Sequence, residues 1–266
     1  MSMARKAMLL CGLFALAGCK KGKEPKVTEV DLRPEDKKLV GGGDGEAPPP
    51  APKQLATTTA AGAPAPAGAP VIDVEPLSIG VGADNVGTFT GPPAPESAFV
   101  WAETVGEAVA KSPPGSAVVI AAGAETPFPM LEIAAQGAAA AARPELALRA
   151  AGAAGETTLR ACAPVDKGAC FATELAGAAP FRLTLLKGHA ATIAAPTGDA
   201  PATTLGPLDA ASLGQALGTL GAGNSVILRI TAGADVTAQE VIDALALGEA
   251  AGARKLVFIL GTTPPQ

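Results

Sequence analysis

The side chains that could carry out acid–base chemistry are few and lie far apart in the sequence. His189 is the only histidine among the 266 residues, and it lies in a Gly188-His189 pair where a hairpin turn is expected. A solvent-exposed turn residue is the simpler interpretation, and a ligand or general base is the alternative. Nucleophile, base and orienting group do not come together anywhere in the sequence. We therefore expect no enzyme activity, no metal site and no cofactor.

Two acidic residues occupy equivalent places in two similar stretches of the chain. Glu125 follows the apolar run Ala117–Ala121, and Asp235 follows the run Ser225–Ile230. Each acid precedes an expected helix, and a favourable interaction with the helix N-terminus is enough to explain it. Contact with a partner molecule is the alternative for both residues. Asp243, within the second of these helices, is expected to face solvent.

The first cysteines belong to a targeting segment. The basic pair Arg5-Lys6 precedes an apolar run that ends at Ala17, which is typical of a secretory signal rather than of a membrane span. The run closes with Leu16-Ala17-Gly18-Cys19, which resembles the bacterial lipobox. We expect residues 1–18 to be removed and Cys19 to carry acyl chains that anchor the protein to a membrane. An ordinary signal peptide with a chance cysteine is the alternative.

The residue after the expected lipidation site bears on which membrane is used. Lys20 stands where an aspartate commonly retains lipoproteins in an inner membrane. This favours the periplasmic face of the outer membrane, with the inner membrane as the alternative.

Cys162 and Cys170 remain as a pair in the oxidising compartment that such a signal implies. Asp166-Lys167-Gly168 between them is typical of a turn, with strands expected at 157–161 and 171–175. We expect a disulfide that staples a β-hairpin. The spacing differs from Cys-x-x-Cys, and no second cysteine pair or histidine cluster accompanies it, so redox catalysis and metal binding are not expected.

Charge and composition limit the partners and the folded region. From Val71 onward the chain has ten Lys and Arg against eighteen Asp and Glu, a net charge of −8, so we expect no nucleic-acid partner. The stretch Gly41–Pro70 holds seven prolines and six glycines in thirty residues and cannot bury enough apolar surface to fold. Residues 19–70, which begin with the lipidated cysteine, are expected to form a disordered tether.

The rest of the chain contains an internal repeat, which indicates the elements that carry the residues above. The offset between the copies is 110 over most of the repeat, 108 near Gly106 and 106 at Gly82. The matched pairs include Gly82 with Gly188, Gly106 with Gly214, Ile120 with Ile230, Glu125 with Asp235, and Leu146 with Leu256. We predict a first module at 71–152 and a second module, with the disulfide hairpin at its start, at 153–266.

Each module is expected to follow the order β-hairpin, helix, strand, helix, strand. In the second module these elements are a hairpin at 183–195, a helix Asp209–Leu220 capped by Asp209, a strand 225–230, a helix that starts with Thr237 and Glu240 at capping-box spacing and stops at Gly252, and a strand 256–260. In the first they are a hairpin at 77–90, a helix that begins at Trp101 and ends before Pro113, a strand 117–121, a second helix, and a strand 146–149. Strand–helix–strand units favour parallel pairing. The predicted fold class is α+β, with a small mixed sheet in each module and two helices on one face.

The order of elements and the residues around the second helix resemble the periplasmic domain of the TolR/ExbD family. The matching residues of the second module are Val236, Val241, Ile242, Asp243, Ala244 and Ala251-Gly252, and those of the first are Thr126-Pro127-Phe128-Pro129, Met130, Leu131 and Ile133. The resemblance covers about two thirds of the chain. It implies a periplasmic binding module that pairs as a dimer and associates with the cell wall or with energised envelope complexes.

The departures from the family shape the functional hypothesis. The family's transmembrane helix, whose aspartate couples to proton flow, has no counterpart here, and Gly123 and Gly233 stand where the family has an acid. We therefore predict a lipid-anchored binding module that is not itself proton-coupled, with its two copies paired within one chain. The expected partner is peptidoglycan or an envelope protein. A structural spacer lipoprotein with no specific ligand is the alternative.

Overall fold

The computed structural model describes residues 53–91, 93, 95–115, 117–164, 170, 175, 178–196, 201–250 and 255–262, with the backbone alone at 95–97, 249 and 250. Several expectations lie outside these residues. They are the signal segment 1–18, Cys19, the tether up to residue 52, the turn at 166–168 with most of the strand after it, and the helix stop at Gly252.

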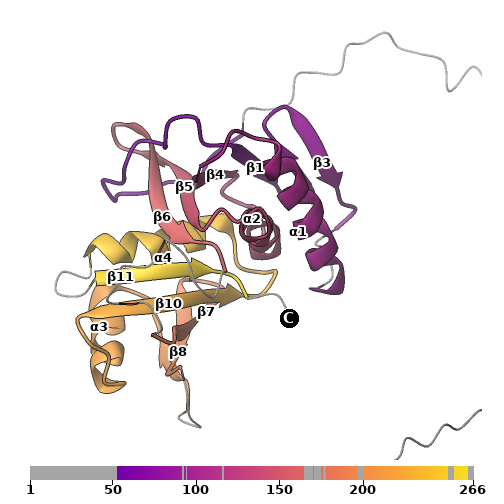
Figure 1. Ribbon diagram of the computed structural model, residues 1–266. Coiled ribbons are helices and arrows are strands. Elements are labelled where there is room, and N and C mark those ends of the chain that lie inside the picture. Colours follow the sequence, from indigo (N-terminus) through magenta and orange to yellow (C-terminus); the bar gives the residue numbers. More distant parts are fainter. Residues whose placement is uncertain are drawn as a thin grey trace, which may run out of the picture. The chain divides into compact units, whose positions relative to one another are not determined.

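The described strands form one mixed sheet. The first half of the chain contributes β1 (Val71–Glu75), β2 (Ser78–Val81), β3 (Asp84–Thr88), β4 (Ala117–Ala122), β5 (Glu145–Gly152) and β6 (Gly155–Cys162). The second half contributes β7 (Phe181–Leu186), β8 (Ala190–Ala194), β9 (Thr203–Leu205), β10 (Ser225–Ala232) and β11 (Lys255–Leu260). Their order in space is β3-β2-β1-β4-β5-β6-β11-β10-β7-β8-β9 (Figure 1).

The same order of elements occurs in each half. In the first half, β1–β3 form an antiparallel meander, and β4 pairs in parallel with β1 and with β5. In the second half, β7–β9 form the meander, and β10 pairs in parallel with β7 and with β11. The described helices are α1 (Pro95–Ala110), α2 (Phe128–Ala140), α3 (Ala210–Thr219) and α4 (Ala238–Ala250). In each half, the second helix crosses over between the two parallel strands.

The predicted fold class, two tandem modules with separate small sheets and two helices on one face of each, is wrong. β6 pairs antiparallel with β5 and parallel with β11, at Cys162 and Ile259, and so joins the halves into one sheet. Buried apolar side chains of both halves also belong to one cluster. The physical reason is that β5 and β11 would otherwise be exposed apolar edges, and β6 covers both. The expected boundary at 152/153 falls in the turn of the β5–β6 hairpin, where Gly152 pairs with Gly155.

The helices are also arranged differently in the two halves. α1 packs against α2 (Figure 1), and the two approach closely because glycines lie at their contact. A Cβ atom on Gly137 would lie 2.5 Å from Cγ1 of Val105, and one on Gly106 would lie 2.8 Å from Cβ of Ala140. In the second half, α3 contacts β9, while α4 covers β11 and β6.

Two alignments within the repeat need correction. Ile120 and Ile230 are matched residues, and they pair with Ile72 of β1 and Leu183 of β7, respectively. β7 is therefore the counterpart of β1. The match of Gly82 with Gly188 had instead equated β7 with β2. The first half has one more strand before the matched glycine, because β1 precedes β2. In the last strand, Leu146 pairs with Val118 and Phe258 with Leu228, so Leu146 corresponds to Phe258 and not to Leu256.

The second helix of each half keeps the offset of 110: α2 spans 128–140 and α4 spans 238–250. The loops before these helices meet, and their hydrogen bonds are Phe128 N–H to Val236 O and Ala238 N–H to Thr126 O, each 2.8 Å. Pro127 and Thr237 form an antiparallel bridge between the two bonds. The two hydrogen bonds join equivalent residues of the repeat in opposite directions. Residues 126–128 and 236–238 are therefore related by a local two-fold axis.

Residues 53–63, the strap, differ from the expected disordered tether because they lie extended against the fold. Their β-bridges are Leu55 to Gly123, Thr57 to Ala151, and Ala63 to Thr158. The composition argument failed here because backbone hydrogen bonds to the fold hold the segment, whereas the argument considered only apolar side chains. Residues 64–70 then lead from the strap to β1.

Candidate functional site

A polar cluster surrounds the single histidine, where the β7–β8 turn meets α4. The backbone is left-handed at Gly188 (φ 82°) and at His189 (φ 59°). A left-handed conformation is uncommon for a residue other than glycine, so contacts around His189 must hold it. One of them is a hydrogen bond of 2.6 Å from the N–H of Leu208 to the carbonyl of His189.

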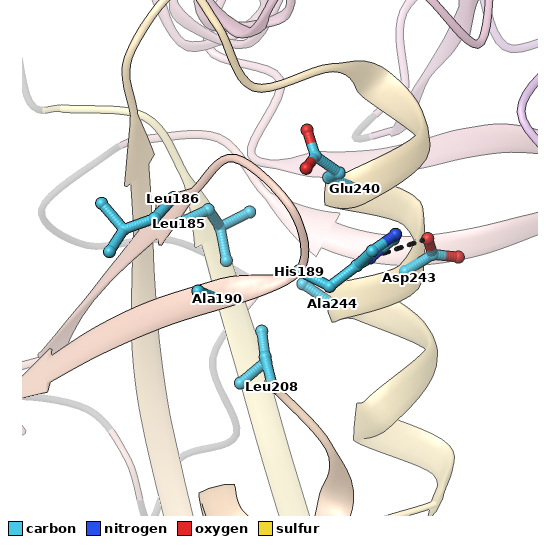
Figure 2. A pocket seen from close by; sticks show the side chains of 8 residues that line it. All are labelled: Leu185, Leu186, His189, Ala190, Leu208, Glu240, Asp243 and Ala244. Carbon is cyan, nitrogen blue, oxygen red and sulfur yellow. Dashed lines mark ion pairs between the residues drawn. The ribbon is translucent and has the colours of Figure 1, made fainter. Parts of the chain in front are cut away.

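The ring of His189 faces α4 (Figure 2). Its Nδ1 lies 3.5 Å from Oδ2 of Asp243, and the two form an ion pair when the histidine is protonated. The side chains are 56% and 40% exposed, so water screens the pair and it contributes at most about 1 kcal/mol. The sequence predicted an exposed histidine in a turn and an aspartate that faces solvent. Both side chains are partly exposed, but the prediction missed that they contact each other.

Glu240 holds the same turn from a position one helical turn earlier. Its Oε1 accepts the N–H of Gly188 at 2.7 Å, and its Oε2 accepts the N–H of Thr237 at 2.9 Å. Burial raises the pKa of Glu240, but the backbone hydrogen bonds from Thr237, Gly188 and His189 and the charge of His189 outweigh it and hold the pKa below its ordinary value. Glu240 thus caps its own helix, as predicted, and also fixes the hairpin turn.

A chain of hydrogen bonds runs from this cluster to the strap through Gln239. Oδ1 of Asp243 accepts a hydrogen bond of 2.9 Å from Nε2 of Gln239. The same amide donates to the carbonyl of Thr57 at 2.9 Å and accepts the N–H of Thr57 at 2.8 Å. The side chain of Gln239 therefore pairs with both backbone groups of one strap residue, as a neighbouring strand would.

The cavity beside His189 is too small for an organic substrate. Its volume is about 20 Å³, and its walls are apolar residues of β7, β8, α4 and the loop before α3 together with His189, Glu240 and Asp243 (Figure 2). This is room for about one water molecule. Its lining contains no serine, threonine, cysteine or lysine, so the arrangement can make polar contacts but has no side chain of these kinds for nucleophilic catalysis.

The acidic residues predicted as partner contacts lie elsewhere, in the loops before α2 and α4. Glu125 and Asp235 are both exposed. Their loops have the same turn, with Thr126 N–H donating to Gly123 O at 3.0 Å and Val236 N–H donating to Gly233 O at 3.3 Å. The pairing of 126–128 with 236–238 brings these two loops together. The structure therefore places both acids beside the contact between the halves.

Cys162 and Cys170 form a disulfide, with their Cα atoms 5.8 Å apart. Cys162 is buried at the end of β6 and belongs to a small apolar cluster with Leu175, Ile227 and Ile259. The bond ties the segment after β6 to the place where the two halves of the sheet join. β6 itself forms a hairpin with β5, and most of the strand expected after the second cysteine lies outside the described residues.

The part of the chain that the structure describes has no group of three or more His, Cys, Asp or Glu side chains that could hold a metal ion. None of the helices in that part has the length and apolar character that a membrane crossing needs.

The sequence did not reveal Gln239 as a functional candidate, and it indicated Glu240 only as a helix cap and not as a partner of the Gly188 turn. A capping pattern marks Glu240, but no local pattern shows that Gln239 would meet a residue 182 positions away. Comparison of the chain with protein-family models, curated proteins and solved structures finds no match. The resemblance to the TolR/ExbD periplasmic domain therefore stays a prediction from the residues that suggested it.

Proposed function

We propose that the chain is a lipid-anchored, non-catalytic interaction module on the periplasmic side of the bacterial envelope. The observation that carries the proposal is Leu16-Ala17-Gly18-Cys19 at the end of an apolar run that follows Arg5-Lys6. Acylation of Cys19 would hold the folded region at a membrane through the intervening tether. The disulfide between Cys162 and Cys170 supports the assignment, because such bonds persist in oxidising compartments.

The partner proposed is peptidoglycan or an envelope protein, and Glu125 and Asp235 are its proposed contacts. Both carboxylates are exposed, and they lie on loops that the chain brings together from its two halves. Together they offer an acidic face that suits a partner with cationic groups. The TolR/ExbD-like residues agree with a periplasmic binding role, without the family's proton coupling.

Metabolic labelling with an alkyne-palmitate in a bacterial host tests the anchor. Full-length chain should take up the label and fractionate with membranes, whereas Cys19→Ser should do neither. Label on the Cys19→Ser chain, or no label on the unaltered chain, would contradict the anchor.

Binding is tested by sedimentation with purified peptidoglycan and by crosslinking in intact cells. The double variant Glu125→Lys/Asp235→Lys should lose the dominant interaction. The matched control is Glu103→Lys/Glu107→Lys, which changes two exposed acids of α1 by the same charge. Equal binding by all three chains would exclude the two loops as the contact, and absence of any binding would favour a structural spacer.

A further inference from the structure

The strap lies across both halves of the fold and makes mainly backbone contacts. In the first half, Thr58 N–H donates to Ala151 O at 2.9 Å and Ala151 N–H donates to Ala56 O at 2.8 Å. Ala63 and Thr158 exchange two further bonds, of 3.0 and 2.8 Å. Recognition of this kind depends on extended backbone and tolerates many sequences.

In the second half, Gln239 holds the strap at Thr57 with the paired hydrogen bonds described above. Its amide is kept in place by Asp243, which in turn faces His189. The polar cluster therefore positions a side chain that recognises extended backbone. An amide that satisfies both backbone groups of one residue is suited to any peptide in this conformation. The hydroxyl of Thr57 adds one longer hydrogen bond, of 3.3 Å, to the same amide oxygen.

Beneath the strap, the groove accepts a small side chain. Ala56 is 1% exposed and lies over apolar residues of β4, α2, β5 and α4, so its pocket is formed by both halves. A cavity of about 10 Å³ remains there. The alanine therefore fits the pocket without filling it.

At the start of the strap, the groove accepts a basic side chain. Nζ of Lys53 lies 3.5 Å from Oδ1 of Asp73 and 3.3 Å from Oε1 of Glu75, and it donates to the carbonyl of Ala121. The lysine side chain is only 20% exposed, although it belongs to a segment of few buried side chains. The groove thus specifies a cation three positions before a small residue.

We propose that this groove is a binding site for an extended peptide segment of a partner protein, with Lys or Arg three positions before a small apolar residue, and that the strap is its resident occupant. Residues 64–70 connect the strap to β1, and a segment tethered so closely has an effective concentration on the order of millimolar. The strap buries only one small apolar side chain, so this tether adds to the backbone hydrogen bonds and the Lys53 ion pairs that hold it in place. A partner segment of the same pattern can replace it.

The test measures binding of a fluorescein-labelled synthetic peptide of residues 53–64 to the full chain purified in detergent, by fluorescence anisotropy. Ala56→Asp places a charge in the apolar pocket and should release the strap while leaving the groove intact. We expect the peptide to bind the Ala56→Asp chain at least tenfold more tightly than the unaltered chain. Peptides with Lys53→Ala or Ala56→Asp should bind at least tenfold more weakly than the parent peptide.

Amide hydrogen exchange shows whether the strap has been released, since Thr58 and Ala63 should lose protection while β4 and β10 keep theirs. If Ala56→Asp prevents folding, Thr57→Pro serves instead, because it removes the N–H that Gln239 accepts. A folded chain with a released strap that does not bind the peptide would overturn the proposal. The experiment measures peptide binding and neither acylation nor contact with an envelope partner, so its failure would leave the proposed lipid-anchored function standing.

Discussion

Asp209 shows how one carboxylate sets the start of a helix and makes it sensitive to pH. Its Oδ1 accepts the N–H of Ser212 at 2.7 Å, and Oγ of Ser212 accepts the N–H of Asp209 at 3.1 Å. The hydrogen bond from the Ser212 backbone is the main reason that the pKa of Asp209 lies below its ordinary value of 3.8. The N-cap predicted from the sequence is confirmed.

A carboxyl group whose pKa is lower in the folded chain than in the unfolded chain stabilises the fold at any pH above the unfolded-state pKa. This stabilisation is lost as the pH falls through the folded-state pKa. We therefore expect Asp209→Ala to lower the denaturation midpoint at pH 7, and the difference from the unaltered chain to shrink below pH 4. Asp209→Asn should keep most of the cap but remove this pH dependence. A difference that stays constant from pH 7 to pH 3 would contradict the role of the charge. Urea denaturation across this pH range measures it.

The sequence revealed the roles of individual residues whose partners are close in the chain and missed the roles of residues whose partners are distant. Asp209 and Glu240 have partners within three positions, so spacing alone indicated them. The partners of His189 and Gln239 are separated from them by 54 and 182 positions, and depend on how the halves fold together. The disulfide partners Cys162 and Cys170 were indicated because few other cysteines remained.

Among the elements, α1 and α3 are counterparts in sequence but pack differently, and two matched glycines expose the difference. A Cβ at Gly106 would lie 2.8 Å from Ala140 on α2, whereas a Cβ at Gly214 would have no atom within 4 Å. We expect Gly106→Ala and Gly137→Ala each to destabilise the fold by about 1–3 kcal/mol through overpacking.

Gly214→Ala is the matched control and should stabilise the fold by about 0.5–1 kcal/mol, because alanine favours the helix. Chemical denaturation of the three variants gives the free energies of unfolding. Stabilisation by Gly106→Ala would show that α1 and α2 do not need their close approach.

The disulfide fixes the segment that follows β6, at the junction of the two halves. Closing a loop of this length stabilises the folded chain by about 2–3 kcal/mol in the chain-entropy model. We expect Cys162→Ala/Cys170→Ala, or reduction of the unaltered chain, to lower the free energy of unfolding by that amount. Hydrogen exchange at Ile259, which pairs with Cys162, should quicken as well. Reductant should have no effect on the double variant.

Periodicity and breakers indicated most helices and parallel strands, but not the way the two halves join. The runs that became β4, β10, α3 and α4 carry their own apolar pattern and caps. The hairpin of β6 with β5 was missed because Gly155–Cys162 contains two threonines and an arginine, and nothing local indicates that this strand pairs with the one before it. The strap was missed for the same reason: its partners are backbone groups of distant residues.

Across the whole molecule, one shared core predicts that the halves unfold together. Leu245 lies on α4, is 3% exposed and belongs to the cluster that includes residues of both halves. Trp101, the single tryptophan, lies on α1 in the first half and contacts Phe89 edge-on, with ring centroids 4.8 Å apart. Its fluorescence therefore reports on the half that does not contain Leu245.

Leu245→Ala should lower the free energy of unfolding by about 2–5 kcal/mol, because it opens a cavity in the core. We expect the two halves to unfold as one unit, because β6, the paired loops before α2 and α4, and the common core join them. The unfolding transition followed by Trp101 fluorescence must then shift by the same amount as the one followed by far-ultraviolet circular dichroism. Val100→Ala, at a side chain that is 64% exposed, is the control and should change stability by less than about 0.5 kcal/mol. A Trp101 transition that stays in place while a second transition moves would mean that the halves fold independently, despite sharing one sheet.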